Sequence, residues 1–251
     1  MKYIRFKKDE KVLYGILNGD EIAQLADDFL VDDQTMTGST YRLDSVNILP
    51  PVEPGKIIAI GLNYKEHAEE SGKPVPDEPM MFMVSPSAVI GQNDAIKLPT
   101  KEHRIDYEAE LAIVIGKTAT HVKHEEALDY VFGYTINNDV SDRNLQKKDG
   151  QFTRAKSFQT FKPLGPVIEN NLNPNNVNIS LYVNGVTRQQ SNTNDLIHDV
   201  ESIIVNITEV MTLNPGDVIL TGTPSGVAPL KEGDTVEIEI EGIGRLVNIV
   251  E

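Results

Sequence analysis

Two glutamates at the start of one apolar strand and an aspartate after another are the side chains best suited to hold a metal ion. The segment DYEAELAIVIG covers Asp106–Gly116. Because residues i and i+2 share a face of a strand, Glu108 and Glu110 point the same way. Both faces of this strand become apolar toward its end, so the two carboxylates face a steep desolvation cost unless a cation neutralises them. Asp139, which follows a second apolar strand, supplies a third carboxylate that could converge on them.

An all-oxygen ligand set predicts a hard cation. Three carboxylates, with no cysteine and no obligatory histidine, favour Mg²⁺ or Mn²⁺, with Ca²⁺ as a further option. One alternative is that Glu108 and Glu110 pair with basic side chains at a strand edge. Another is that the carboxylates hold a purely structural Ca²⁺, in which case replacing Glu108 would cost mainly stability rather than activity.

Three further groups have side chains that could act on a substrate. His67 and Glu70 are three residues apart in a segment of helical composition, so they can meet, and a histidine oriented by a carboxylate suits a general base near neutral pH. The alternative is an acidic surface helix. Lys156 could be a solvated lysine or an oxyanion partner. The loop Thr221–Gly226 follows a strand, and its amides and hydroxyls could bind a carboxylate or form a simple turn.

The pattern of elements around these residues predicts a mostly β chain with a few helices. Leu49–Gly55 is rich in Pro and Gly, and it divides a predicted small β domain at residues 1–52 from a larger domain at 53–251. Apolar residues at three- and four-residue steps predict a helix over Leu196–Met211. Prolines at 74, 76, 79 and 86 predict a loop or lid. The main predicted strands are Tyr3–Phe6, Val12–Leu17, Glu21–Leu25, Lys56–Leu62, Glu108–Ile115, Phe132–Asn137, Ile179–Val183, Asp217–Thr221 and Thr235–Glu241.

Composition excludes several classes of function. The 251 residues carry a net charge of −15, which argues against nucleic acid and anionic membrane surfaces as partners. No cysteine is present, so disulfides, thiolate nucleophiles and thiolate metal sites are excluded. The first residues form no uninterrupted apolar segment of signal-peptide type, and no apolar run approaches the length of a membrane span. These features predict a cytoplasmic protein.

Together these segments resemble the fumarylacetoacetate hydrolase family. The resemblance covers roughly residues 53–251, and it rests on long motifs in family order: GLNYKEHAEE, DYEAELAIVIG, NNDVSDRNLQ, RAKSFQTFKPLGP, VNGVTRQ, TLNPGDVILTGTPSGV and EIEGIG. It implies an α+β, mostly β fold in which a mixed β-roll and a few helices form a catalytic domain behind the small N-terminal β unit. It further implies a bound Mg²⁺ or Mn²⁺, a homodimer, and a small-molecule 2-oxo carboxylate as substrate.

The resemblance also implies roles for individual residues. The implied metal ligands are Glu108, Glu110 and Asp139. The implied catalytic residues are His67, Glu70 and Lys156. The residues implied to hold the substrate carboxylate are Arg143, Gln146 and Thr223. The chain departs from many relatives at Phe152, Gln159 and Val84, where Trp, Asp and Lys are frequent, and these positions bear on substrate identity if they line the pocket.

The expected reaction is hydrolysis of a C–C bond in an acylpyruvate or fumarylpyruvate. The substrate's 1-carboxylate and 2-oxo oxygen would chelate the metal, which would act as a Lewis acid and stabilise an enolate. His67, oriented by Glu70, would activate a water, and Lys156 would stabilise the oxyanion. The same enolate serves isomerisation of a 2-hydroxyhepta-2,4-diene-1,7-dioate or decarboxylation of oxaloacetate, and the sequence does not separate these reactions. A non-catalytic metal-binding protein of the same fold is a further alternative.

Overall fold

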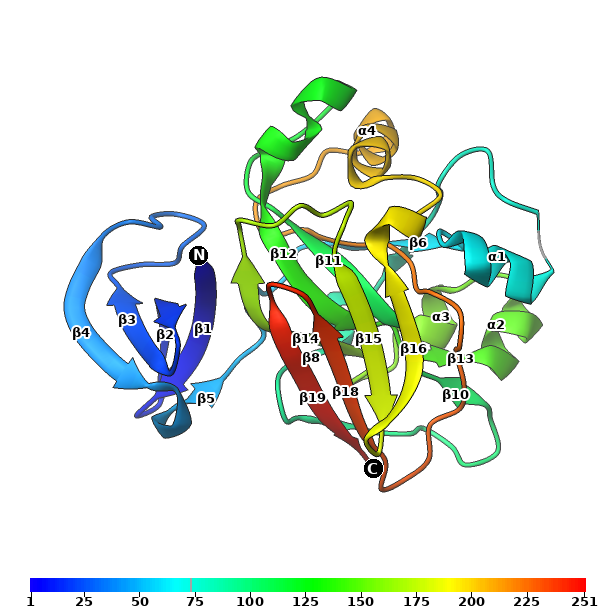
Figure 1. Cartoon of the computed structure of the whole chain (residues 1–251), viewed down its shortest axis with the longest axis horizontal. Coiled ribbons are helices and arrows are strands. Elements are labelled where there is room, and N and C mark those ends of the chain that lie inside the picture. Colours follow the sequence, from blue (N-terminus) through cyan, green and yellow to red (C-terminus); the bar gives the residue numbers. More distant parts are fainter. Residues whose placement is uncertain (73) are drawn as a thin grey trace.

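The chain forms β-sheets flanked by short helices (Figure 1). The computed structural model describes residues 1–72 and 74–251. The strands are β1 Lys2–Lys8, β2 Lys11–Asn18, β3 Glu21–Leu25, β4 Met36–Arg42, β5 Asn47–Ile48, β6 Ile57–Gly61, β7 Met80–Val84, β8 Val89–Ile90, β9 Ala95–Ile96, β10 Ile105–Asp106, β11 Ala109–Ile115, β12 Val131–Asn138, β13 Ser141–Asp142, β14 Lys162–Glu169, β15 Asn178–Val183, β16 Val186–Asn192, β17 Val218–Leu220, β18 Thr235–Ile240 and β19 Gly244–Val250. The helices are α1 Lys65–Ser71, α2 Arg143–Asp149, α3 Thr153–Lys156 and α4 Val200–Val210, with 3-10 turns at Leu43–Ser45, Pro86–Ala88, His124–Tyr130 and Thr193–Asp195.

The largest sheet runs in the order β4-β3-β2-β1-β14-β12-β11-β17-β6-β7, with β5 paired to β1 and β8 paired to β14. A second sheet has the order β16-β15-β18-β19-β9, and β10 and β13 form a small third one. Most neighbours are antiparallel, whereas β17 runs parallel to β6. The prediction of a mostly β fold is therefore confirmed. Within the described residues, no helix combines the length and apolar character needed to cross a membrane.

Strand β11 lies at the centre of the fold and is buried on both faces, as its sequence predicts. It pairs with β12 on one side and β17 on the other. Leu111 and Ile113 belong to a core cluster that also contains residues of β15, β18 and α4. Ala112 and Val114, on the opposite face, belong to a second core cluster. Glu110 therefore lies in this buried strand and Glu108 directly precedes it.

The first fifty residues join the main sheet. Strand β1 pairs antiparallel with β14, with Lys2 opposite Glu169. The N-terminal ammonium of Met1 lies 2.7 Å from the Glu169 carboxylate. Figure 1 shows β1 to β5, in blue, to one side of the strands that carry the site. The division into domains at 1–52 and 53–251 stays a prediction.

Two elements differ from the sequence-based expectations. Helix α4 begins at Val200 rather than near 196, because the Asp199 side chain accepts a hydrogen bond from Ser202 N and caps the helix there. The proline-rich stretch is not wholly irregular, because β7 forms in it and pairs with β6. Pro79 and Pro86 flank β7 instead of interrupting it, so no ladder hydrogen bond is lost to a proline inside the strand.

Truncation of the central strand is expected to destabilise the fold strongly. Ile113 is fully buried in β11, so Ile113→Ala should lower the free energy of unfolding by about 2–5 kcal/mol. The matched control is Ile249→Ala in β19, where the side chain is 51% exposed and the loss should stay below about 1 kcal/mol. Urea unfolding of both variants measures the difference, and equal losses would contradict the assigned core.

Candidate active site

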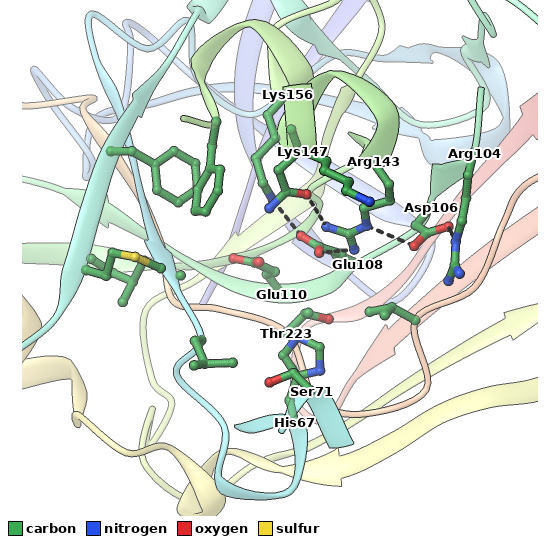
Figure 2. A pocket seen from close by; sticks show the side chains of 18 residues that line it. His67, Ser71, Arg104, Asp106, Glu108, Glu110, Arg143, Lys147, Lys156 and Thr223 are labelled. Carbon is green, nitrogen blue, oxygen red and sulfur yellow. Dashed lines mark hydrogen bonds and ion pairs between the residues drawn. The ribbon is translucent and has the colours of Figure 1, made fainter. Parts of the chain in front are cut away.

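A cavity of about 520 Å³ opens beside the start of β11 (Figure 2). Its walls come from β6, α1, β7, β10, α2, α3 and the loop after β17. The predicted site residues that line it are His67, Glu108, Glu110, Arg143, Gln146, Lys156 and Thr223. Glu70 and Asp139 do not line it, and each contacts a residue that does. The fold thus gathers all nine residues, although they are spread over more than 150 positions of the chain.

Glu108 and Glu110 line this cavity, and Asp139 converges on them from just behind its wall. One carboxylate oxygen of each lies within 4.8 Å of the other two, and all three residues are buried. The antiparallel pairing of β11 with β12 brings them together, because it sets Ala109 opposite Asn138. Asp139 N then donates to the Glu108 carbonyl at 2.8 Å.

Lys156 neutralises part of this negative charge. Its Nζ donates to Glu108 Oε2 at 2.6 Å and to Asp139 Oδ2 at 2.5 Å. Burial alone would lower the pKa of Lys156, but Asp139 and Glu108 raise it above its usual value. Burial alone would likewise raise the pKa of Glu108, yet Arg143 and Lys156 hold it well below its usual range. Lys156 and Glu108 are therefore both charged at neutral pH.

Glu110 is the carboxylate of the cluster whose negative charge is least compensated by neighbouring cations. Its Oε2 accepts a hydrogen bond from Gly222 N at 2.8 Å. Burial, together with the nearby charges of Asp139 and Glu108, raises its pKa well above the usual range. A buried carboxylate in this position is stabilised by an added cation.

Lys162, at the start of β14, contacts the far side of Asp139. Its Nζ lies 2.7 Å from Asp139 Oδ1, so the two side chains form a buried ion pair. The same ammonium donates to the carbonyls of Phe161 and Val140. Burial lowers the pKa of Lys162. Sequence reasoning missed this residue, although a lysine that enters an apolar strand in FKPLGP was a usable signal.

These observations fit a divalent cation at the three carboxylates. The cluster is buried, it offers only oxygen donors, and the negative charge of Glu110 in it is under-compensated. Hard cations such as Mg²⁺, Mn²⁺ and Ca²⁺ prefer carboxylate oxygens of this kind. Glu108, Glu110 and Asp139 are the residues that would hold such an ion.

Arg143 and Gln146 enter the cavity from α2. Asp142 caps this helix by accepting from Leu145 N, and the three-residue spacing puts Arg143 and Gln146 on one face. Arg143 donates to Gln146 Oε1 at 2.8 Å and to Glu108 Oε1 at 2.5 Å. It also donates to Asp106 at 2.8 Å. Sequence reasoning assigned no role to Asp106, which is buried and fixes the plane of the guanidinium.

His67 and Glu70 meet across one turn of α1. His67 Nδ1 lies 3.3 Å from Glu70 Oε2, and that oxygen also accepts from Gly226 N at 3.2 Å. With Nδ1 donating to the carboxylate, Nε2 is left as a base. Figure 2 shows His67 across the cavity from Lys156, with Glu108 and Glu110 between them. A group bound at the carboxylates thus has a base on one side and an ammonium on the other.

One wall of the cavity is aromatic. Phe82 and Phe152 pack edge to face, with ring centroids 4.9 Å apart, and Lys156 Nζ lies 5.5 Å from the centroid of the Phe82 ring. Among the three departures from the family pattern, only Phe152 lines the cavity. Val84 is buried in the core and Gln159 is exposed, so the idea that these two shape the pocket is wrong.

Comparison with known proteins identifies the family. The model of the fumarylacetoacetate (FAA) hydrolase C-terminal domain matches residues 56–251. The chain belongs to the fumarylacetoacetate hydrolase family. A second model, Rv2993c-like N-terminal, matches residues 1–51. Fumarylacetoacetate hydrolase family members include hydrolases, isomerases and tautomerases, and this chain is an enzyme of that family.

Relatives with different named activities resemble the chain over most of its length. An oxaloacetate tautomerase from Xenopus laevis mitochondria is 43% identical over 82% of this chain and 69% of its own length. A 5-carboxymethyl-2-hydroxymuconate delta-isomerase from Mycobacterium smegmatis is 41% identical with a TM-score of 0.93, covering 100% of this chain and 99% of its own. A maleylpyruvate hydrolase from Sphingobium sp. SYK-6, in complex with manganese(II) and pyruvate, is 32% identical with a TM-score of 0.84. The match covers 100% of this chain and 98% of the hydrolase chain.

Proposed function

We propose that the chain is a divalent-metal-dependent enzyme that hydrolyses a C–C bond in a small 2-oxo carboxylate of the acylpyruvate or fumarylpyruvate type. The observation that carries this proposal is the single cavity in which the His67–Glu70 pair faces the cluster of Glu108, Glu110 and Asp139. A purely structural ion would not need a histidine–carboxylate pair opposite it. A non-catalytic role is disfavoured for the same reason.

The carboxylate cluster would hold Mg²⁺ or Mn²⁺. The donor set supports this choice, as does the manganese(II) in the maleylpyruvate hydrolase structure. When bound, such an ion supplies Lewis-acid chemistry, polarising the 2-oxo group and stabilising negative charge that develops on it.

The charge around the cavity favours an anionic substrate even though the chain is acidic overall. Among the residues that line the cavity, the cations Arg104, Arg143, Lys147 and Lys156 outnumber the carboxylates Asp106, Glu108 and Glu110. Beside it, Glu70 and Asp139 bring the carboxylates to five and Lys162 brings the cations to five, so a divalent ion would make the balance positive. Because such a local field attracts anions, a carboxylate-bearing substrate suits the site.

Arg143, Gln146 and Thr223 would bind the substrate carboxylate. Arg143 retains N–H groups beyond those it donates to Asp106, Glu108 and Gln146. The Gln146 carbonyl oxygen already accepts from Arg143, so its amide N–H groups are the part left for a ligand. Fixed donors of this kind recognise a carboxylate in a defined orientation.

Hydrolysis would use His67 and Lys156 in complementary roles. His67, oriented by Glu70, takes a proton from a water molecule, whose oxygen attacks the distal carbonyl carbon. The positively charged Lys156 donates to the oxyanion that forms. When the C–C bond breaks, its electron pair passes to the pyruvate fragment, which is released as the enolate and then protonated. The acyl group leaves as a carboxylic acid.

Proton transfer without cleavage is the second candidate. It is favoured by the names of the relatives, because the tautomerase and the delta-isomerase are 43% and 41% identical and the maleylpyruvate hydrolase is 32% identical. In that reaction His67 would move a proton along the substrate and no water would be added. Both candidates need a base, whereas decarboxylation of oxaloacetate does not.

Isotope labelling separates the two candidates. The Mn²⁺-loaded protein would be incubated in ¹⁸O-labelled heavy water with acylpyruvates, fumarylpyruvate, 2-hydroxyhepta-2,4-diene-1,7-dioate and oxaloacetate. Hydrolysis predicts two products and one ¹⁸O in the released carboxylic acid. Deuterium incorporation into an uncleaved product would overturn hydrolysis in favour of tautomerisation or isomerisation. If no compound is cleaved with ¹⁸O incorporation and none gains deuterium without cleavage, hydrolysis and proton transfer are both overturned.

A further inference from the structure

Gln189 is a buried polar residue on an otherwise exposed stretch of β16. Residues 186–188 and 190 are exposed, whereas Gln189 is 1% exposed and its side chain points inward. It does not line the cavity. It lies behind Thr223, which does line it, and no step of the proposed reaction uses it.

Three short hydrogen bonds, and a longer one of 3.5 Å from Nε2 to the Ser225 carbonyl, fix the orientation of the Gln189 amide. Its Oε1 accepts from Ala109 N at 2.9 Å. Its Nε2 donates to the Pro224 carbonyl at 2.8 Å and to Thr223 Oγ1 at 2.8 Å. A backbone N–H can only donate and a backbone carbonyl can only accept. The amide oxygen must therefore face Ala109, and the NH₂ group must face the loop.

This orientation sets the role of the Thr223 hydroxyl. Because Oγ1 accepts from Gln189, its own proton is free for another acceptor. Among the described residues, Thr223 Oγ1 donates no hydrogen bond to the protein, and the side chain borders the cavity. The hydroxyl therefore offers a donor to a bound ligand, which suits a carboxylate oxygen.

We propose that Gln189 is a positioning residue that holds the Thr223 hydroxyl as a donor to the substrate carboxylate. The proposal rests on the function above, in which Thr223 contacts that carboxylate. Ala109 lies between Glu108 and Glu110, so the same amide also ties the Thr223 loop to the segment that carries two of the three clustered carboxylates. The spacing between the ligand's carboxylate and the cluster is thereby fixed.

A double-mutant cycle tests the proposal. The variants are Gln189→Met, Thr223→Val and their combination, with Gln190→Met as the control because Gln190 is the exposed neighbour on the same strand. Calorimetry measures the dissociation constant of oxalate for the Mn²⁺-loaded proteins, and thermal melting measures stability. Thr223→Val should weaken oxalate binding roughly tenfold, as expected for one hydrogen bond to a charged group. Gln189→Met should weaken it about three- to tenfold, and Gln190→Met less than twofold.

The decisive measurement is oxalate binding by the double variant, Gln189→Met with Thr223→Val. If Gln189 acts through Thr223, Gln189→Met should weaken oxalate binding no further in the Thr223→Val background. An equal loss in both backgrounds, or no loss with Thr223 present, would overturn this inference and leave the proposed function standing. Unchanged binding in Thr223→Val would overturn the carboxylate contact of the proposed function, and this inference with it. Should Gln189→Met fail to fold, Gln189→Glu keeps the acceptor for Ala109, and the same outcomes decide.

Discussion

Glu110→Gln is expected to lower turnover by at least about 100-fold and to abolish stabilisation of the protein by Mn²⁺. Altering a residue that merely orients a metal ligand typically costs about 10–100-fold in metal affinity or activity, and a lost ligand costs at least as much. The substitution is nearly isosteric, and the glutamine oxygen can still accept from Gly222 N. The loss would therefore report on the metal rather than on a misfolded strand.

The same variant should be more stable than the parent when no metal is present. Burial, with Asp139 and Glu108 nearby, raises the pKa of Glu110 in the folded chain above its unfolded value. Its contribution to stability is therefore present at low pH and is lost as pH rises through the folded pKa. Glutamine removes that loss, so metal-free Glu110→Gln should melt roughly 2–4 °C higher at pH 8, which corresponds to about 1 kcal/mol. The difference should shrink as the pH falls toward 4.5, the ordinary pKa of glutamate.

Scanning calorimetry in EDTA between pH 5 and pH 8, repeated with excess Mn²⁺, measures both effects. Glu209→Gln, at an exposed position of α4, is the matched control and should behave like the parent. A Glu110→Gln protein that keeps full turnover, or that Mn²⁺ still stabilises, would contradict the assignment of Glu110 as a ligand.

His67→Ala is expected to lower kcat by about 10²- to 10⁴-fold, the usual contribution of a general base. Mn²⁺ and oxalate should bind within a few-fold of the parent, because His67 lies across the cavity from the carboxylate cluster (Figure 2). Glu70→Gln should cause a smaller loss, since the imidazole remains but is no longer oriented by a charged partner. Steady-state kinetics give kcat and KM, and calorimetry gives the two dissociation constants.

The control for His67 is His124→Ala, because the His124 side chain is 59% exposed and pairs only loosely with Asp199 at 3.7 Å. It should retain parental kinetics. Full activity in His67→Ala would rule out water activation by this residue, and with it the proposed hydrolytic mechanism.

Short-range patterns were enough to place the carboxylates. Alternation along 106–116 puts Glu108 and Glu110 on one face, and the antiparallel pairing of β11 with β12 brings Asp139 to Glu108. His67 and Glu70 meet because a helix brings residues three apart together. A single helix therefore accounts for the His67–Glu70 contact, and a single strand pair accounts for the three carboxylates.

The supporting residues lie in quoted motifs, Gln189 at the end of VNGVTRQ and Lys162 in RAKSFQTFKPLGP, but their roles were missed because tertiary contacts define those roles. Gln189 reaches Ala109 across 80 positions of sequence, and it sits in a strand whose neighbours read as exposed. Lys162 belongs to β14, and only the position of that strand beside β12 brings its ammonium to Asp139. Strand β7 was also missed, because the flanking prolines suggested a loop while its pairing with β6 decides its conformation.

Glu108, Glu110 and Asp139 are proposed to hold the divalent ion that the enzyme requires to act on a 2-oxo carboxylate. The most direct test is turnover by metal-stripped protein, before and after addition of Mg²⁺ or Mn²⁺, on acylpyruvates, fumarylpyruvate, oxaloacetate and 2-hydroxyhepta-2,4-diene-1,7-dioate. Turnover of at least one compound that requires the metal and is lost in Glu110→Gln is the predicted result. Turnover that is equal without metal, or tight metal binding without turnover of any compound, would contradict it.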